Sequence, residues 1–329
     1  MKFWKRFSFV SQSKGLTRRT ITWLWFLLPS ILGVMLFYKL PFADVIRRSF
    51  VKAVTMEYTG LDNYQMVFHN EAFILAMKNT GCFLLVCLPA LILFSFFIAV
   101  ALSRTALRKI FKSFLLIPMA VPAATIAVVW RMLLNDYGQI NGVLAWMGLP
   151  TVDFLGSNAA FWVLVVTYIW KNLGYTTLLW MAGMESILDA LTEAARVDGA
   201  NENQCLYHIV VPNLKPTLYT IVIISFLNSF KVFREAYLVA GAYPQPSIYL
   251  LQHLFNNWYT NLELDKMAAA AVIIFIILLI TVMFLKRVWD GEEAQDEKKK
   301  SVKKSDTDTI SRTHLFSAAN VVKLFHKGK

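Results

Sequence analysis

Five polar side chains interrupt two long apolar runs, and they are the first residues in this chain that could do chemistry. They are Lys171, Asn172, Asn228, Lys231 and Glu235. A lysine at the centre of a membrane helix costs roughly 2.5 to 3.5 kcal/mol, so such residues usually face a bundle interior or a water-filled cavity. The last three recur at three- and four-residue spacing and share one helix face. On that face we expect Lys231 to pair with Glu235, close to Arg234.

Aromatic residues accompany these polar groups in the first of the two runs. They are Trp162, Tyr168, Trp170 and Tyr175. Amphipathic rings with a few polar groups suit a polyhydroxylated ligand. The residues predicted to line a translocation pathway are therefore Trp170, Lys171, Asn172, Tyr175, Asn228, Lys231 and Glu235. In the alternative interpretation, the charged groups satisfy one another or snorkel, and the tryptophans belong to an interface belt.

The sequence contains no motif that would support enzyme catalysis. The sequence has no Gly-x-x-x-x-Gly-Lys-Ser/Thr stretch, so we expect no ATP bound through a P-loop. It has no Gly-x-Ser-x-Gly elbow, and its five histidines lack metal-ligand spacing. We therefore predict a protein that is not an enzyme, with no catalytic residue, metal or cofactor of its own.

The elements that position these residues are membrane helices. Of the 329 residues, 57% are hydrophobic and 16% charged, and the apolar residues gather in runs long enough to cross a bilayer. Six spans are expected, at 22–41, 77–103, 113–134, 159–183, 217–239 and 267–287. The predicted fold is an all-α polytopic helical bundle. Pro89 falls in the second span and Pro118 and Pro122 in the third, where they either kink helices around a cavity or are simply tolerated.

The net charge of +12 is explained by membrane topology and does not require a nucleic-acid partner. A basic N-terminus, 1–21, holds six cations, and eleven follow from Lys286 onward. This asymmetry places both termini in the cytoplasm and the loop 42–76 outside, although that loop carries Arg47, Arg48 and Lys52. The tail 288–329 is too polar to build a core and is predicted to be disordered. A short amphipathic helix on the inner membrane face is the alternative for its end.

One polar segment, 184–216, separates the fourth and fifth spans and contains "EAARVDGANENQCLYHIVVP". Gly199 is predicted to be a left-handed C-cap, and Asn201 to form a capping box with Gln204 before Pro212 limits the second helix. Two short helices joined by a turn could resemble a DNA-reading helix-turn-helix. The segment is too short and too acidic for that, so we expect no nucleic-acid partner. It is either a protein-docking surface or a connector.

The spacing within this segment resembles the EAA loop of ABC importer permeases, in the carbohydrate branch of the maltose and glycerol-phosphate type. Glu193-Ala194-Ala195, then Gly199, Ile209 and Val211-Pro212 carry the resemblance, which extends over about 22–287. It departs at Val211, Asn203 and Leu206, where leucine or aromatic residues are usual. The residues that this resemblance assigns to coupling with an ATPase are Glu193, Ala194, Ala195, Asp198, Gly199, Ala200, Ile209 and Pro212.

The resemblance implies a type I ABC importer transmembrane domain with six transmembrane helices, in a bacterial inner membrane and in contact with lipid. Its core of five spans would cover 77–287. The implied partners are a second permease, a cytoplasmic ATPase dimer that binds the ATP, and an extracytoplasmic solute-binding protein. The implied cargo is a sugar. The alternatives are a membrane scaffold that docks a cytoplasmic protein without moving solute, and an ion-coupled secondary carrier.

Overall fold

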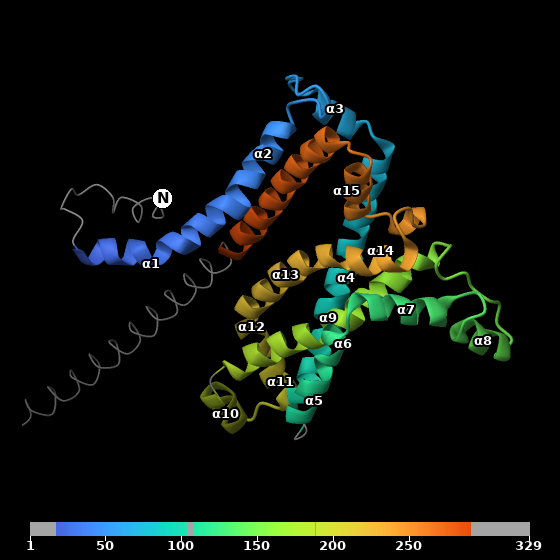
Figure 1. The fold of residues 1–329 in the computed structure, drawn as a ribbon. Coiled ribbons are helices and arrows are strands. Elements are labelled where there is room, and N and C mark those ends of the chain that lie inside the picture. Colours follow the sequence, from blue (N-terminus) through green and yellow to red (C-terminus); the bar gives the residue numbers. More distant parts are fainter. Residues whose placement is uncertain (1–17, 104, 106–107, 188, 291–329) are drawn as a thin grey trace, which may run out of the picture. The chain divides into compact units, whose positions relative to one another are not determined.

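The structure is a computed structural model that describes residues 18–103, 105, 108–187 and 189–290. The predictions for the N-terminus, 1–21, and for the tail, 288–329, therefore lie largely outside the described residues. Apart from one isolated bridge between Val51 and Tyr58, the regular structure of these residues is helical (Figure 1). The chain divides into two compact units, 1–71 with 257–274 and 72–256 with 275–329.

Among the described residues, four helices are long and apolar enough to cross a membrane, and a fifth span results if one bent pair is counted. The four are Phe26–Arg48, Glu71–Ser103, Lys215–Ala240 and Leu264–Asp290, and the bent pair is Ile110–Ala120 with Ala123–Trp146. The predicted fourth span is a continuous 27-residue helix, α9 (Ala159–Glu185). α9 is not one of the four because Lys171, Asn172 and its aromatic residues make it less apolar than they are. The chain is an all-helical membrane protein.

The first unit begins with a helical stretch that is longer than expected. It contains α1 (Arg18–Val34), a π-helical turn (Met35–Lys39) and α2 (Leu40–Arg48). The helical stretch continues past residue 41, the predicted end of the first span, and Pro41 stands in the first turn of α2. Asp44 bonds both Arg47 and Arg48, which lets the helix continue through them. After α3 (Asp62–Phe68), α4 (Glu71–Ser103) leads into the second unit.

The predicted third span is broken. Its pieces are α5 (Arg108–Leu115), α6 (Ile117–Ala120) and α7 (Ala123–Leu134), followed by α8 (Gln139–Trp146). The two halves meet at an angle of 85°. Pro122 caps α7 in an extended conformation, and Pro118 stands in the first turn of α6. Pro89, by contrast, lies inside the continuous α4. The kink interpretation therefore holds at Pro122 and the tolerance interpretation at Pro89.

The remaining elements run from the polar segment to the C-terminal helix. They are α10 (Asp189–Val197), α11 (Glu202–Cys205), a π-helical turn (Leu206–Val210), α12 (Val211–Asn213), α13 (Lys215–Ser229), a 3-10 turn (Phe230–Val232), α14 (Phe233–Ala240), a 3-10 turn (Pro246–Ile248), α15 (Leu251–Thr260) and the helix Leu264–Asp290. The predicted fifth span thus contains a 3-10 turn between α13 and α14. That turn sits in the middle of the polar face noted above.

Two apolar clusters hold α9 in the second unit. In the first, Tyr168 meets Phe83 of α4 edge to face, 5.4 Å between ring centroids, and Val232 packs beside them. In the second, Trp180 packs with Ile221 of α13. Gly174 lets the Leu115 backbone approach, because a Cβ there would overlap the Leu115 carbonyl. Both faces of α9 are therefore fixed against their neighbours.

Candidate functional site

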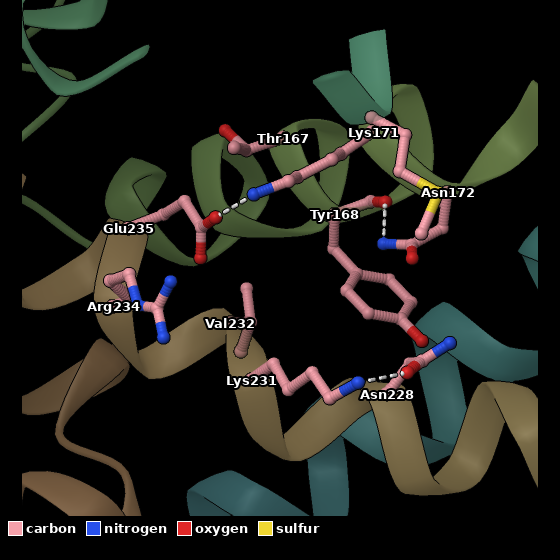
Figure 2. Close-up of a pocket in the computed structure, with 10 residues that line it drawn as sticks. Thr167, Tyr168, Lys171, Asn172, Asn228, Lys231, Val232, Arg234 and Glu235 are labelled. Atoms are coloured by element: carbon pink, nitrogen blue, oxygen red, sulfur yellow. Dashed lines mark hydrogen bonds and ion pairs between the residues drawn. The ribbon is translucent and has the colours of Figure 1, made fainter. Parts of the chain in front are cut away.

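A cavity of about 230 Å³ opens where α9 faces α13, α14 and the break in the third span. It is lined by Met119, Thr167, Tyr168, Lys171, Asn172, Asn228, Lys231, Val232, Arg234 and Glu235. Figure 2 shows the side chains of α9 on one side and those of Asn228 to Glu235 on the other. Five of the seven residues predicted to line a pathway thus lie around one cavity.

An ion pair joins the two sides of this cavity. The Lys171 ammonium contacts the Glu235 carboxylate across the space between α9 and α14 (Figure 2). The Glu235 side chain is 6% exposed and that of Lys171 is 24% exposed, so both charges are largely withdrawn from solvent. The pair therefore fixes α14 against α9 at the cavity.

The predicted pairing of Lys231 with Glu235 is wrong. Lys231 Nζ instead donates to Asn228 Oδ1 at 2.8 Å. An i,i+4 pair needs a regular α-helix between its members, but the 3-10 turn Phe230–Val232 intervenes. Glu235 is buried and turned to α9, whereas Lys231 is exposed. The spacing placed both residues at one cavity but could not show which cation reaches the carboxylate.

Hydrogen bonds within α9, and one from α9 to α13, orient its other polar groups. The Tyr168 hydroxyl donates to the Ser225 carbonyl at 2.8 Å, which ties α9 to α13. The Asn172 amide donates to the Tyr168 carbonyl at 2.9 Å, and the Thr167 hydroxyl donates to the Val163 carbonyl. These bonds hold the α9 wall in place before any ligand arrives.

Trp170 and Tyr175, the other two residues predicted to line a pathway, do not line this cavity. Trp170 is 41% exposed, because two residues along a helix carry it to the side opposite Tyr168. Tyr175 is half-buried about one turn beyond the end of the lining residues. The lining residues outside the prediction are Met119, Thr167, Tyr168, Val232 and Arg234. Spacing from Lys171 would have found Thr167 and Tyr168, whereas no sequence signal pointed to Met119.

The 184–216 loop has the two-helix form expected of it. Gly199 has φ +90° and ends α10, as predicted. The Asn201 side chain accepts from the Gln204 backbone N–H at 2.9 Å, and the Gln204 side chain accepts from the Asn201 N–H at 2.8 Å. This confirms the predicted capping box. The second helix ends at Asn213, one residue beyond Pro212, which occupies the first turn of α12.

An exposed ion pair closes the turn of this loop. Arg196 at the end of α10 meets Glu202 at the start of α11, with Nε to Oε1 at 2.9 Å. The Glu202 carboxylate raises the pKa of Arg196 above its usual value. The two helices are therefore linked by charge as well as by the turn itself.

A shallow cavity of about 360 Å³ follows the turn, and five of the eight predicted coupling residues line it. Its lining consists of Ala195, Asp198, Gly199, Ala200, Gln204, Cys205, His208 and Ile209. Glu193, Ala194 and Pro212 lie outside it and are exposed. Val197 and Tyr207 are 88% and 66% exposed, so the loop also presents apolar groups.

Another ion pair connects the start of the loop to α5, the first piece of the third span. Glu185, the last residue of α9, accepts from Lys112 Nζ of α5 at 2.8 Å. The Lys112 ammonium lowers the pKa of the Glu185 carboxyl, an effect that partial burial opposes. Both residues are partly exposed, and Glu185 lines a cavity of about 550 Å³ that also reaches Arg196 and Glu202. Within the described ranges, no group of three or more His, Cys, Asp or Glu side chains could hold a metal ion.

Comparison with known proteins identifies the family of this chain. Residues 91–290, more than half of the chain, match the family model of the binding-protein-dependent transport system inner membrane component. The chain belongs to this family. It is thus an ABC transporter permease, an inner-membrane multi-pass component of a binding-protein-dependent transport system, in a family without catalytic activity.

Two relatives agree with the assignment, and a solved structure shares the fold. The permease is 30% identical over 240 residues to the trehalose/maltose transport system permease protein MalF of Thermococcus litoralis, covering 71% of this chain and 81% of that one. It is 27% identical over 261 residues to the sn-glycerol-3-phosphate transport system permease protein UgpA of Yersinia enterocolitica, covering 77% and 85%. A bacterial ABC transporter involved in the import of the acidic polysaccharide alginate has the same fold, with TM-score 0.72 and 23% identity over 88% of this chain and 98% of that one.

Proposed function

We propose that this permease forms the translocation pathway of an ATP-driven, binding-protein-dependent importer for a carbohydrate. The cargo class is supported by the sugars named for the trehalose/maltose relative. It is also supported by the cavity, where amides and a tyrosine accompany a few charges, as suits a ligand rich in hydroxyls.

One observation carries the proposal: the cavity and the 184–216 loop share two helices. α9 supplies Lys171 and Asn172 to the cavity and ends at Glu185, where the loop begins. α13 begins at Lys215, where the loop ends, and supplies Asn228. Because a helix moves as a nearly rigid rod, a displacement of the loop moves both walls of the cavity. This is the linkage that an importer driven from the cytoplasm needs.

The energy source lies in another subunit. Since the chain has no P-loop, we assign ATP to a cytoplasmic ABC ATPase dimer and no cofactor to the permease. The loop would dock on that dimer through the exposed Glu193 and Ala194, the turn at Gly199, and the apolar groups Val197 and Tyr207. A mixed polar and apolar surface of this kind suits a protein partner.

A second permease and an extracytoplasmic solute-binding protein complete the proposed assembly. None of the residues of the helix Phe26–Arg48 is buried inside this chain. We therefore expect this helix to contact lipid or the second permease. The binding protein would deliver the sugar and set much of the choice among sugars.

The proposed topology has six spans with both termini in the cytoplasm. α9 is the sixth, since 27 helical residues reach about 40 Å, more than the roughly 30 Å of hydrocarbon. In a cysteine-free background, an impermeant thiol reagent should label Thr55→Cys from outside the cell. It should label Gln204→Cys only after permeabilisation. Labelling of both from the same side would contradict this topology.

Affinity purification from the native membrane tests the assembly. The permease should co-purify with an ABC ATPase and a second, similar permease in stoichiometric amounts. Adding ATP and carbohydrate-loaded binding protein should raise the ATPase rate of that complex. A permease that is stable and abundant but isolated would favour the scaffold or secondary-carrier alternatives.

A further inference from the structure

The cavity beside the Lys171–Glu235 pair has an excess of positive charge. Its lining contains three cations, Lys171, Lys231 and Arg234, but one carboxylate, Glu235, so its formal charge is +2. Lys171 is neutralised by Glu235. The excess therefore belongs to Lys231 and Arg234.

These two cations have no carboxylate partner within the part of the chain that the structure describes. Lys231 donates to the neutral amide oxygen of Asn228, and no ion pair reaches Arg234. Both lie in the apolar helical stretch Lys215–Ala240, where charged groups are expensive and usually serve function. The explanation that Lys231 and Glu235 merely satisfy each other fails on this geometry.

Snorkelling does not explain Lys231 either. Lys231 lies nearer the Ala240 end of its span, so a snorkelling ammonium would extend toward that end. It reaches the opposite way, to Asn228, three residues toward the middle of the helix (Figure 2). The ammonium is thus held at the cavity rather than at the nearer membrane interface.

We propose that this cavity takes a carbohydrate that carries an anionic group, a carboxylate or a phosphate, and that Arg234 and Lys231 bind that group. A guanidinium offers two parallel N–H donors that match either anion, and the Lys231 ammonium adds a second positive charge to the same cavity. The amides of Asn172 and Asn228 then face the sugar hydroxyls. The proposal rests on the proposed import function and narrows its cargo.

The test uses the complete transporter with its binding protein in proteoliposomes loaded with ATP. Three labelled cargoes of similar size are compared below saturation: a uronate disaccharide, a disaccharide monophosphate and the neutral disaccharide. Wild type is compared with the double variant Lys231→Gln/Arg234→Gln. Lys78→Gln is the control, because it removes an exposed cation of α4 that does not line the cavity.

We expect wild type to take up one of the anionic cargoes faster than the neutral one. The double variant should lower that uptake about tenfold or more, the range for losing charge-assisted hydrogen bonds, and Lys78→Gln should leave it unchanged. Arg234→Lys should retain part of the uptake because it keeps the charge. Which anionic cargo responds identifies carboxylate or phosphate.

Two results would overturn the inference while leaving import intact: wild type that prefers the neutral cargo, or a double variant that lowers all cargoes equally. Uptake of none of the three by wild type, with an active ATPase, would overturn the carbohydrate import function itself. Membrane abundance of each variant, measured in the same vesicles, separates lost binding from lost folding.

Discussion

Removing one member of the Lys171–Glu235 pair should destabilise the permease more than removing both. Glu235→Gln leaves the Lys171 ammonium without its carboxylate in a site where its side chain is 24% exposed. Lys171→Met leaves the Glu235 carboxylate alone, with 6% exposure. Breaking a buried pair in this way costs about 3 to 5 kcal/mol, because one charge stays buried without compensation. The double variant buries no unpaired charge, so it should lose less than about 2 kcal/mol.

The assay is equilibrium unfolding of the solubilised permease in mixed detergent micelles, followed by tryptophan fluorescence, for the four proteins of the cycle. Since each single variant should lose about 3 to 5 kcal/mol and the double variant less than about 2, the coupling energy between the two sites should be at least about 4 kcal/mol. A matched cycle on Arg196 and Glu202, whose side chains are 52% and 57% exposed, should give less than about 1 kcal/mol. Equal coupling energies in the two cycles would refute the reasoning that burial makes the first pair strong.

Four further predictions concern single positions. Gly199→Val should abolish uptake at normal membrane abundance, because φ +90° costs a β-branched residue about 1 to 3 kcal/mol. Gly199→Asn should reduce uptake less, since asparagine tolerates the left-handed region better. Equal uptake by the two variants would contradict this prediction. Gly174→Ala should cost about 1 to 3 kcal/mol in unfolding by overlap with the Leu115 carbonyl, whereas Gly142→Ala, with open space around it, should not. Asn201→Ala should cost about 1 kcal/mol through the lost cap, measured by the same unfolding. Burial lowers the pKa of His253 from 6.5 to about 4, so the unfolded chain takes up a proton at higher pH than the folded one. The free energy of unfolding should therefore be highest above pH 6.5 and fall by about 3 kcal/mol between pH 6.5 and 4. The melting temperature of His253→Phe should depend less on pH over that range.

Local signals in the sequence were sufficient for much of the helical structure and for the 184–216 loop. Apolar length alone located most of the long helices. The loop was predictable because Gly199, Asn201 and Gln204 act on their own backbone within a few residues.

Predictions that depended on tertiary packing were less successful. The partner of Glu235 lies 64 residues away, so spacing within one helix favoured Lys231 over Lys171. The 85° break near Pro122 was one of two open interpretations, because a proline in a membrane helix is compatible with either. Met119 lines the cavity from α6, next to that break, and no local pattern encodes this position.

The central claim is that ATP hydrolysis on the side of the 184–216 loop drives a carbohydrate through this permease. The most direct test measures labelled saccharide uptake and ATP hydrolysis together in proteoliposomes containing the complete transporter, with ionophores collapsing every ion gradient. We predict uptake that requires ATP, continues without gradients, and stops in Gly199→Val. Uptake that follows an ion gradient and ignores ATP would contradict the account.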